Sequence, residues 1–341
     1  MIYFFIGFVL TLAMVWLMRA CALHFKIVDK PDSGRKRHTG SIPLLGGIPL
    51  FIIFWSIVLY LLRWHQINGI ELLGNKLLAA FVGSAVILLV GIADDLRPFS
   101  ACWRLILTSA AIFITVLLGG GLEKITHPFG GFVRLSSLAG GALVFCWLLG
   151  MTYTTKILDG LDGLATGVVT IGTGMIYFLT ALPKFYQPNV SLVALIFAGC
   201  CLGFLIFNFP PAKIFLGESG SLFIGFMLGV LAILGGGKLA TALLVMAVPI
   251  LDVARVLYVR WRKHLPLFQG DREHLHFQLL DFGLSERQVV VAYYLVAAVF
   301  GVTTFFLQSF QKLLALGFLV VAMLAVAWKI DRMRSTKAFL Q

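Results

Sequence analysis

The sequence predicts an all-α membrane protein, a polytopic bundle of about eleven transmembrane helices that forms a single domain over residues 1–341. Composition is the first observation: 60% of the 341 residues are hydrophobic and only 12% are charged. A soluble protein carries about 25% charged residues. The second is that apolar runs long enough to cross a bilayer as helices recur along the whole chain. The third is that charged residues gather between these runs.

Each apolar run holds about 16 to 21 residues, close to the length that crosses the hydrocarbon core as a helix. No low-complexity segment or internal repeat divides the chain, and no basic segment precedes the first run as it would in a cleavable signal. We expect the spans at 2–20, 44–62, 77–93, 103–120, 138–156, 164–182, 190–208, 221–236, 238–257, 288–308 and 312–330.

The distribution of basic residues predicts the orientation. With the N-terminus outside and the C-terminus in the cytoplasm, 20 of the 27 Lys and Arg residues lie on the cytoplasmic side. This bias explains the net charge of +12, with attraction to anionic membrane lipids or an anionic substrate as the alternative, and no nucleic acid is needed. Of 15 acidic residues, only Glu71 and Glu123 fall outside. Acids contribute little to topology, so their clustering predicts a carboxylate site at the cytoplasmic face.

Two of the inner segments lie early in the chain. The stretch 29–47, DKPDSGRKRHTGSIPLLGG, offers Arg35, Lys36 and His38 beside the membrane, where basic groups suit phosphate binding; a purely topogenic loop is the alternative. The stretch GIADDLRPFS places Asp94 and Asp95 at the inner end of the third run. Neighbours on a helix point about 100° apart, so we expect different roles: a general base or phosphate-side ligand, and an orienting partner. Simple helix termination is the alternative.

The stretch TKILDGLDGLATG, residues 155–167, carries Asp159 and Asp162 between two apolar runs. A charged side chain near hydrocarbon is costly and usually functional. The i, i+3 spacing puts both carboxylates on one side of a helical turn, and the adjoining glycines allow a ligand to approach the backbone. Leu164 then begins a helix whose free N–H groups favour anions. An N-cap with a second surface Asp is the alternative.

The stretch NFPPAKIFLGESGSLFIG, residues 208–225, predicts a loop of small residues that runs into a helix, an arrangement that binds phosphates. Glu218 offers a metal ligand within it, and Phe215 a surface for stacking on a planar base. A tight turn is the alternative reading of the same residues.

The stretch 260–288 contains His274 and His276 beside Arg272. Because no Cys cluster or third nearby His completes a zinc site, phosphate contacts fit the two imidazoles better. Asp252 is a separate intramembrane charge, with Arg255 as its expected partner. The five cysteines show neither metal-ligand spacing nor a disulfide framework. Carboxylates, phosphate-binding loops, imidazoles and arginines on one face predict magnesium-assisted phosphoryl transfer from a nucleotide diphosphate to a membrane-held acceptor.

Five ordered motifs make the chain resemble the polyprenyl-phosphate N-acetylhexosamine-1-phosphate transferases from Asp29 to about Gln288. They are R-K-x-H with P-x-x-G-G, the D-D pair, D-G-L-D-G-L-A, N-x-x-P-A-K-x-F-x-G-x-x-G-S, and D-R-x-H-x-H. The resemblance implies transfer of a sugar-1-phosphate, GlcNAc-1-phosphate above all, from a UDP-N-acetylhexosamine to polyprenyl (undecaprenyl) phosphate at the cytoplasmic face of the plasma membrane, with release of UMP. It also implies dependence on Mg²⁺, with Mn²⁺ as a substitute, and a product that begins a cell-envelope glycan.

The resemblance also implies roles for particular residues. Asp159 and Asp162 line the nucleotide-sugar and magnesium site, with Glu218 as the direct metal ligand. Asp94, assisted by Asp95, activates or positions the lipid phosphate. The remaining substrate-binding residues hold the uridine side (Asn208, Phe215), add a charge beside the nucleotide (Lys156) or contact phosphates (Arg35, Lys36, His38, Arg272, His274, His276).

The chain departs from the family pattern at four positions. Tyr153 and Lys156 stand where asparagines are common, Glu218 where Asp is common, and Phe277 where a second adjacent His is common. The H-x-H motif favours the UDP-N-acetylglucosamine branch over the muramoyl-pentapeptide branch, which usually has three consecutive histidines. A multispan transporter and an inactive lipid-phosphate-binding paralogue are the alternatives. The oligomeric state, with a homodimer as one option, and the choice between direct attack and a covalent intermediate stay open.

Overall fold

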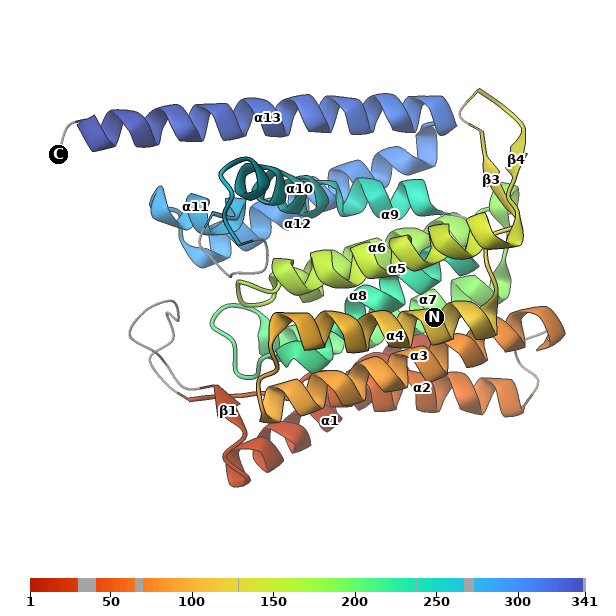
Figure 1. The fold of residues 1–341 in the computed structure, drawn as a ribbon. Helices are drawn as coiled ribbons and strands as arrows, with labels where there is room; N and C mark the ends of the chain where they lie inside the picture. The colour runs from red at the N-terminus through yellow and green to blue at the C-terminus, as the bar shows by residue number, and fades with distance from the viewer. Residues whose placement is uncertain (30–40, 65–69, 128, 237, 267–272, 340–341) are drawn as a thin grey trace.

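The structure, a computed structural model, describes residues 1–29, 41–64, 70–127, 129–236, 238–266 and 273–339 (Figure 1). Within those ranges the α-helices are α1 (Ile2–His24), α2 (Gly47–Arg63), α3 (Ile70–Leu96), α4 (Ala101–Gly119), α5 (Ser137–Leu158), α6 (Leu164–Ala181), α7 (Pro188–Asn208), α8 (Gly217–Leu234), α9 (Leu239–Val245), α10 (Ala247–Arg262), α11 (Leu275–Asp281), α12 (Glu286–Phe306) and α13 (Ser309–Phe339). A short 3-10 helix covers Pro183–Phe185.

Eight of the described helices are long and apolar enough to cross a membrane: α1, α3, α4, α5, α6, α7, α8 and α12. The pair α9 and α10 passes the same test together, and α2 and the Phe310–Ala325 part of α13 are shorter apolar helices. Every predicted span therefore coincides with one helix, except the span at 238–257, which coincides with the α9–α10 pair. The prediction of an all-α polytopic membrane protein is confirmed at this level.

The predicted span at 238–257 is not one straight helix. The chain breaks after Val245, and α9 and α10 are bent by 74° relative to each other. Pro249 gives a physical reason, because its ring would clash with the carbonyl group of the residue four positions earlier, which is Val245. Beyond the bend, Asp252 of α10 contacts His274 and Leu275 at the start of α11.

Two small antiparallel hairpins, which the sequence does not predict, join helix ends. In one, β1 (Val28–Asp29) pairs with β2 (Ile42–Pro43); in the other, β3 (Lys124–Thr126) pairs with β4 (Phe132–Arg134). Strands of two or three residues are too short to show an alternating pattern in sequence. The strand β2 also contacts the loop before α8, because the backbone carbonyl of Pro43 accepts a hydrogen bond from the backbone nitrogen of Phe215 at 2.9 Å.

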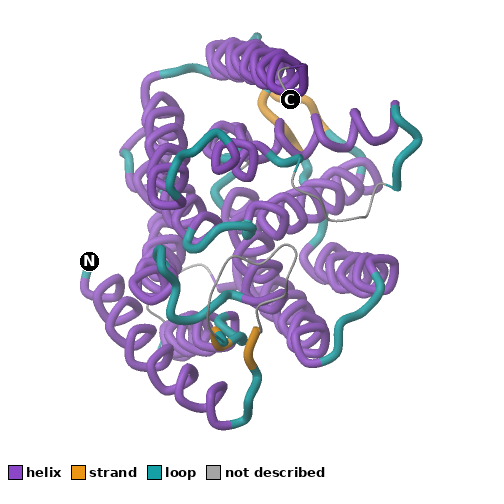
Figure 2. The backbone as a smooth tube through the Cα atoms, turned by 90° about the vertical axis from the view of Figure 1, so that its left-hand side faces the viewer, coloured by secondary structure: helices purple, strands orange, loops and turns teal. Residues whose placement is uncertain are grey.

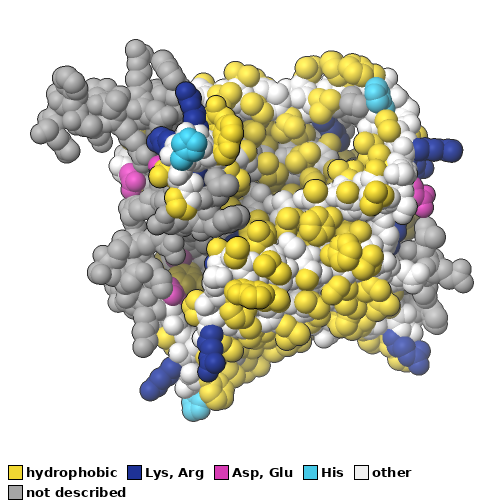
Figure 3. Space-filling model, viewed as in Figure 1, with side chains coloured by type: hydrophobic (Ala, Val, Ile, Leu, Met, Phe, Trp, Pro, Cys, Tyr) yellow, Lys and Arg dark blue, Asp and Glu magenta, His cyan; other side chains and the backbone are white. Residues whose placement is uncertain are grey.

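The core of the bundle lies around α7 and α8. In the most apolar 18-residue segment of each helix, 72% of the residues are buried in α7 and 78% in α8. The corresponding shares are 17% in α1 and 22% in α4. The helix α8 packs against α2, α3, α5, α6, α7 and α9. Broad apolar surface covers the middle of the molecule, while charged side chains lie mainly toward its two ends (Figure 3). This is the distribution expected of a protein surrounded by lipid.

The loops that carry the motifs lie at one end of the bundle. The turn after α3, the turn between α5 and α6, the loop before α8 and the start of α11 all lie at the left of Figure 1, and the β3–β4 hairpin lies at the other end. Viewed from the motif end, the helices surround these loops, with β1 and β2 among them (Figure 2). Segments far apart in the sequence therefore meet at one face.

Candidate active site

Asp94 and Glu218 are joined through one arginine. Asp94 lies near the end of α3, is 4% exposed, and accepts hydrogen bonds from Phe99 N at 2.7 Å and from Arg104 Nη1 at 3.0 Å. The same Arg104 nitrogen lies 2.7 Å from Glu218 Oε1. Arg104 belongs to the first turn of α4, whose start is capped by the Ser100 side chain. The guanidinium therefore connects α3 and α4 to the first turn of α8.

Lys156 lies on the other side of Glu218. Its Nζ lies 2.9 Å from Glu218 Oε2, although Oε2 is buried and lacks a partner with hydrogen-bond geometry. The contact between Nζ and Oε2 is therefore a close ion pair whose angle does not suit a hydrogen bond. The side chains of Arg104 and Lys156 are 19% and 18% exposed. Both cations are thus held in place yet retain an accessible surface that a phosphate group can reach.

Asp95 points to a different element from its neighbour. Its Oδ1 accepts from Glu218 N at 2.7 Å, and its Oδ2 accepts from the backbone nitrogen and hydroxyl of Ser219 at 3.2 and 2.7 Å. Asp95 therefore satisfies free N–H groups at the start of α8 from a separate helix. Gly217 permits this approach, because it has φ 70° and an added Cβ would lie 2.6 Å from an Asp95 oxygen. Asp94 and Asp95 therefore contact different elements, and their different roles stay a prediction.

The predicted helical turn that carries Asp159 and Asp162 is a non-helical turn between α5 and α6. Asp159 follows α5 and is half-buried, whereas Asp162 Oδ2 accepts from Ala212 N at 2.7 Å. The two carboxylates are therefore not equivalent. Asp162 holds the loop before α8, and its own backbone nitrogen donates to Glu286 Oε1 at 2.9 Å. The helix α6 begins at Leu164, as predicted.

Asp159 lies in the field of other acids. Burial, followed by the charges of Glu218, Asp162 and Asp95, raises the pKa of Asp159 well above its usual value. An ionised Asp159 therefore needs a positive charge nearby. A bound cation or a cationic substrate group would supply it.

Asn208 and Phe215 shape the loop between α7 and α8. Asn208 is buried; its Oδ1 accepts from the Thr166 hydroxyl at 2.9 Å and its Nδ2 donates to the Ile214 carbonyl at 3.0 Å. Its amide thus stabilises the loop. Phe215 is half-buried, and its backbone carbonyl accepts from Gly46 N at 3.1 Å. The predicted small-residue loop is shorter than expected, because α8 already begins at Gly217 and places Glu218 in its first turn.

His274 and His276 stack on each other, with ring centroids 5.7 Å apart and planes 6° from parallel. His274 Nδ1 lies 2.9 Å from Asp252 Oδ2. His276 is 1% exposed, and burial lowers its pKa from 6.5 to about 4, so its ring is neutral at pH 7. A Cβ on Gly160 would lie 2.5 Å from His276 Nε2, so this glycine allows the D-G-L-D-G-L turn to pack on the H-x-H segment.

Four predicted phosphate-binding residues, Arg35, Lys36, His38 and Arg272, lie outside the residues that the structure describes. The predicted ion pair of Asp252 with Arg255 is confirmed, with the Arg255 nitrogen 3.0 Å from the Asp252 oxygen. Sequence reasoning assigned no role in the site to Arg104 or Glu286. The partners of both residues lie in other segments of the chain. The sequence offers one sign of a role: each is a charged residue in the first turn of a helix that follows a motif.

The described residues show no group of three or more His, Cys, Asp or Glu side chains arranged around a metal position. Mg²⁺ commonly takes only one or two carboxylates and completes its shell with water and substrate phosphates. One feature fits such an ion: the charges of Glu218, Asp162 and Asp95 act on Asp159, whose ionised form therefore needs a cation nearby. The donors are hard oxygens, which suit magnesium. The residues present therefore fit a magnesium ion that binds together with a substrate.

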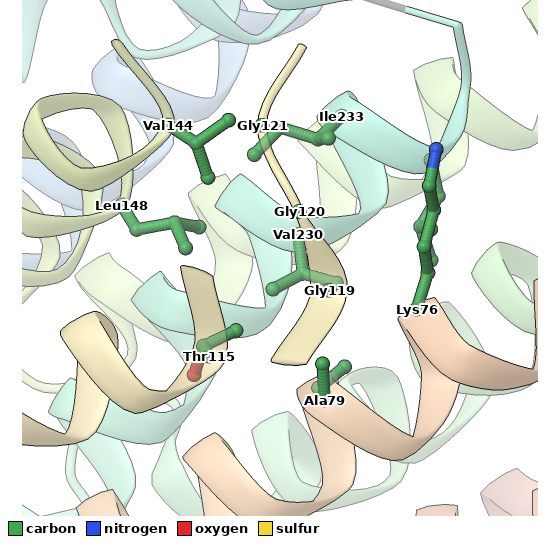
Figure 4. A pocket seen from close by; sticks show the side chains of 12 residues that line it. Lys76, Ala79, Thr115, Gly119, Gly120, Gly121, Val144, Leu148, Val230 and Ile233 are labelled. Atoms are coloured by element: carbon green, nitrogen blue, oxygen red, sulfur yellow. The ribbon is translucent and has the colours of Figure 1, made fainter. Parts of the chain in front are cut away.

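A small, mostly apolar pocket of about 40 Å³ lies elsewhere, between α3, α4, α5 and α8 (Figure 4). Its wall includes Lys76 at the start of α3 and Gly119–Gly121 at the end of α4, which belong to the end opposite the motif loops. None of the predicted site residues lines it. The candidate active site is therefore the carboxylate and cation cluster at the motif end.

Comparison of the sequence with known proteins places the chain in a family. A profile described as Glycosyl transferase family 4 matches residues 77–236. The chain is 31% identical over 315 residues to the probable undecaprenyl-phosphate N-acetylglucosaminyl 1-phosphate transferase of Bacillus subtilis. The aligned region covers 90% of this chain and 84% of that protein. The chain belongs to glycosyl transferase family 4.

Other members of glycosyl transferase family 4 show the same extent of similarity. The decaprenyl-phosphate N-acetylglucosaminephosphotransferase of Mycolicibacterium smegmatis is 29% identical over 339 residues, covering 91% of this chain and 83% of its own. The undecaprenyl-phosphate alpha-N-acetylglucosaminyl 1-phosphate transferase of Escherichia coli K12 is 28% identical over 318 residues, covering 85% and 79%. The family match includes Asp94, Asp159 and Glu218. Family membership identifies the chain as a membrane transferase, and the names of these relatives favour the GlcNAc-1-phosphate branch over the muramoyl-pentapeptide branch.

Proposed function

We propose that this protein transfers GlcNAc-1-phosphate from UDP-GlcNAc to a polyprenyl phosphate and releases UMP. The observation that carries the proposal is the cluster in which Arg104 joins Asp94 to Glu218 and Lys156 contacts Glu218 beside Asp159. It places two cations and several carboxylates at one end of a bundle of apolar helices. Such a site suits two phosphate substrates, one of which is held by the membrane. The names of the similar proteins support the same acceptor and sugar.

In this reaction, an oxygen of the lipid phosphate forms a bond to the sugar-bearing phosphorus of the donor. The bond between the two donor phosphates breaks, and UMP leaves with its electron pair. Arg104 and Lys156 would neutralise phosphate charge as the substrates approach, since both side chains are partly accessible. Asp94 would orient Arg104 toward the lipid phosphate, and Asp95 would fix the first turn of α8 that carries Glu218. Phosphoryl transfer depends mainly on such positioning and charge stabilisation.

Asp159 and Glu218 would hold magnesium, with Asp162 fixing the adjoining loop rather than binding the ion directly. When bound, the ion would neutralise charge on the donor diphosphate as the bond between its phosphates breaks. Mn²⁺ would be an acceptable substitute because it prefers the same hard oxygen ligands. His274 and the uncharged His276 would lie on the nucleotide-sugar side of the site.

The proposed topology has eleven spans, with α2, the α9–α10 pair and α13 added to the eight long apolar helices. The N-terminus would lie outside, and the motif end would face the cytoplasm at the plasma membrane. In a background without the native cysteines, an impermeant thiol reagent added from outside should label a cysteine at Lys184 but not one at Ser100. Labelling at Ser100 would contradict the placement of the site.

The purified protein should convert UDP-GlcNAc and undecaprenyl phosphate, with Mg²⁺, to UMP and a polyprenyl-diphosphoryl sugar. A panel of UDP-sugars, analysed for both nucleotide and lipid product by mass spectrometry, would show which N-acetylhexosamine is used. Equal rates with all donors would contradict the assignment of GlcNAc. Tight binding of undecaprenyl phosphate without turnover of any donor would instead identify an inactive lipid-phosphate-binding protein.

A further inference from the structure

The H-x-H segment is attached to α10 through one buried carboxylate. Asp252 is 3% exposed, and its Oδ1 accepts from Arg255 at 3.0 Å. The backbone nitrogen of Leu275 lies 3.0 Å from both Asp252 oxygens, and Nδ1 of His274 lies 2.9 Å from Oδ2. The same Arg255 nitrogen also donates to the Glu273 carbonyl. One carboxylate and one guanidinium therefore hold three consecutive residues, 273–275.

The contact between Asp252 and His274 determines the chemistry of the imidazole ring. An ionised carboxylate can only accept hydrogen bonds, so the nitrogen that faces it, Nδ1, carries a hydrogen. In the neutral ring the opposite nitrogen, Nε2, is then an acceptor, and in the protonated ring it is a second donor. Within the described part of the chain, His274 Nε2 has no hydrogen-bond partner, and it is not among the polar atoms sealed from solvent.

The ring of His274 is held on a second side. The parallel ring of His276 lies against it, and His276 in turn packs closely on Gly160 in the turn that contains Asp159 and Asp162. The Asp252 contact and this stack together restrict rotation of the His274 ring. Because Asp252 is almost entirely buried beneath the H-x-H segment, its carboxylate does not itself reach a substrate.

We propose that Asp252 is a positioning residue for the transfer reaction, which acts by fixing the orientation and tautomer of His274 so that Nε2 faces the diphosphate of the nucleotide sugar. This inference rests on the proposed function, because it takes His274 to contact the donor. Partners that orient a metal-ligating histidine through its other ring nitrogen commonly change activity by about 10- to 100-fold when replaced. Asp252 holds His274 in the same way through Nδ1, and we expect an effect on the same scale.

Asp252→Asn tests the role directly. Arg255, which can only donate, lies at Oδ1, whereas Leu275 N lies equally near both oxygens, so the amide oxygen should occupy the Oδ1 position and the amide nitrogen should face His274. The ring would then carry its hydrogen on Nε2 instead of Nδ1. We expect kcat/KM for the UDP-sugar to fall by about 10- to 100-fold. Glu123→Gln, the same loss of a carboxylate charge at an exposed position at the other end of the bundle, is the matched control and should leave kcat/KM unchanged.

A double-mutant cycle separates this role from general support of the fold. If Asp252 acts through His274, then Asp252→Asn added to His274→Gln should lower kcat/KM by no more than about twofold further. A further loss as large as that of Asp252→Asn alone would overturn the proposal. So would a fall in the thermal unfolding midpoint of Asp252→Asn without any change in kcat/KM.

The tautomer itself can be measured without turnover. ¹⁵N spectra of histidine-labelled protein, with His274 identified by its loss in His274→Gln, should show hydrogen on Nδ1 in the wild type and on Nε2 in Asp252→Asn. Asp252→Glu keeps an acceptor and should retain the wild-type tautomer, which covers the case in which Asp252→Asn does not fold. An unchanged tautomer in Asp252→Asn, or its loss in a folded Asp252→Glu, would overturn the proposal. Absence of wild-type turnover would count against the proposed function instead.

Discussion

The hydroxyl of Ser219 donates a hydrogen bond to Oδ2 of Asp95 at 2.7 Å and so joins the end of α3 to the start of α8. Asp95 also accepts from the backbone nitrogens of Glu218 and Ser219. A carboxylate that satisfies three donors at a helix start stabilises that start and fixes Glu218, its second residue. The adjacent pair Asp94–Asp95 thus divides into one residue that contacts a cation and one that orients a helix.

Asp95→Ala should therefore destabilise the protein. It leaves two backbone N–H groups and one hydroxyl without their acceptor, and each unsatisfied buried donor costs about 1–3 kcal/mol. The thermal unfolding midpoint in detergent should fall clearly, whereas the exposed control Glu123→Ala should leave it unchanged. If Asp95→Ala unfolds at the wild-type temperature but has lost turnover, Asp95 acts in the chemistry and not through α8.

Glu218 gives the second prediction. If it ligates magnesium, Glu218→Gln should lose nearly all turnover, because a neutral amide is a poor Mg²⁺ ligand. Glu218→Asp should retain part of the activity, since it keeps the charge and shortens the side chain by one methylene. Steady-state rates over a magnesium titration provide the measurement. A wild-type rate and magnesium dependence in Glu218→Gln would exclude Glu218 from the metal site.

The third prediction separates Asp94 from Asp159. Asp94→Asn weakens the hold on Arg104, so kcat should fall by about 100-fold or more while UDP-sugar affinity changes little. Asp159→Asn should weaken magnesium-dependent nucleotide binding as well as the rate. Calorimetry on each purified variant, with and without magnesium, distinguishes the two roles. Loss of nucleotide binding in Asp94→Asn, with normal binding in Asp159→Asn, would show that the roles are reversed.

His276 predicts a pH dependence of stability. Its pKa is lowered from 6.5 to about 4 in the folded protein, so between these values the unfolded chain binds the extra proton. Stability is therefore present above pH 6.5 and falls as the pH decreases from 6.5 toward 4, by up to about 1.4 kcal/mol per pH unit.

His276→Phe should remove that part of the pH dependence, whereas His24→Phe, at an exposed position, should leave it intact. Thermal unfolding midpoints at pH 7 and pH 5 provide the comparison. An identical drop between the two pH values in wild type and His276→Phe would show that His276 does not titrate as a buried group.

Local patterns predicted the helices and several of the site residues. Long apolar runs define membrane helices directly, and the i, i+3 spacing of Asp252 and Arg255 correctly indicated their ion pair. The break near Met246 was missed because hydropathy does not register the backbone clash caused by Pro249. The start of α8 was placed four residues late, because Gly and Ser favour a loop reading when the Asp95 contact from another helix is not known.

Contacts between distant segments were beyond a single sequence. Arg104 and Glu218 are 114 residues apart, and Asp162 and Glu286 are 124 apart, so no periodicity relates them. The sequence placed these residues on one face through the basic and acidic bias of the loops. It could not show which cation neutralises which carboxylate, because that depends on how α4, α5 and α8 pack together.

The central claim is that the protein transfers a sugar phosphate rather than a sugar. UDP-GlcNAc labelled with ³²P at the sugar-bearing phosphorus, incubated with the purified protein, undecaprenyl phosphate and Mg²⁺, tests this claim most directly. The account predicts that the label moves into the lipid product and that the released nucleotide is unlabelled UMP. Release of labelled UDP, with an unlabelled sugar on the lipid, would contradict it.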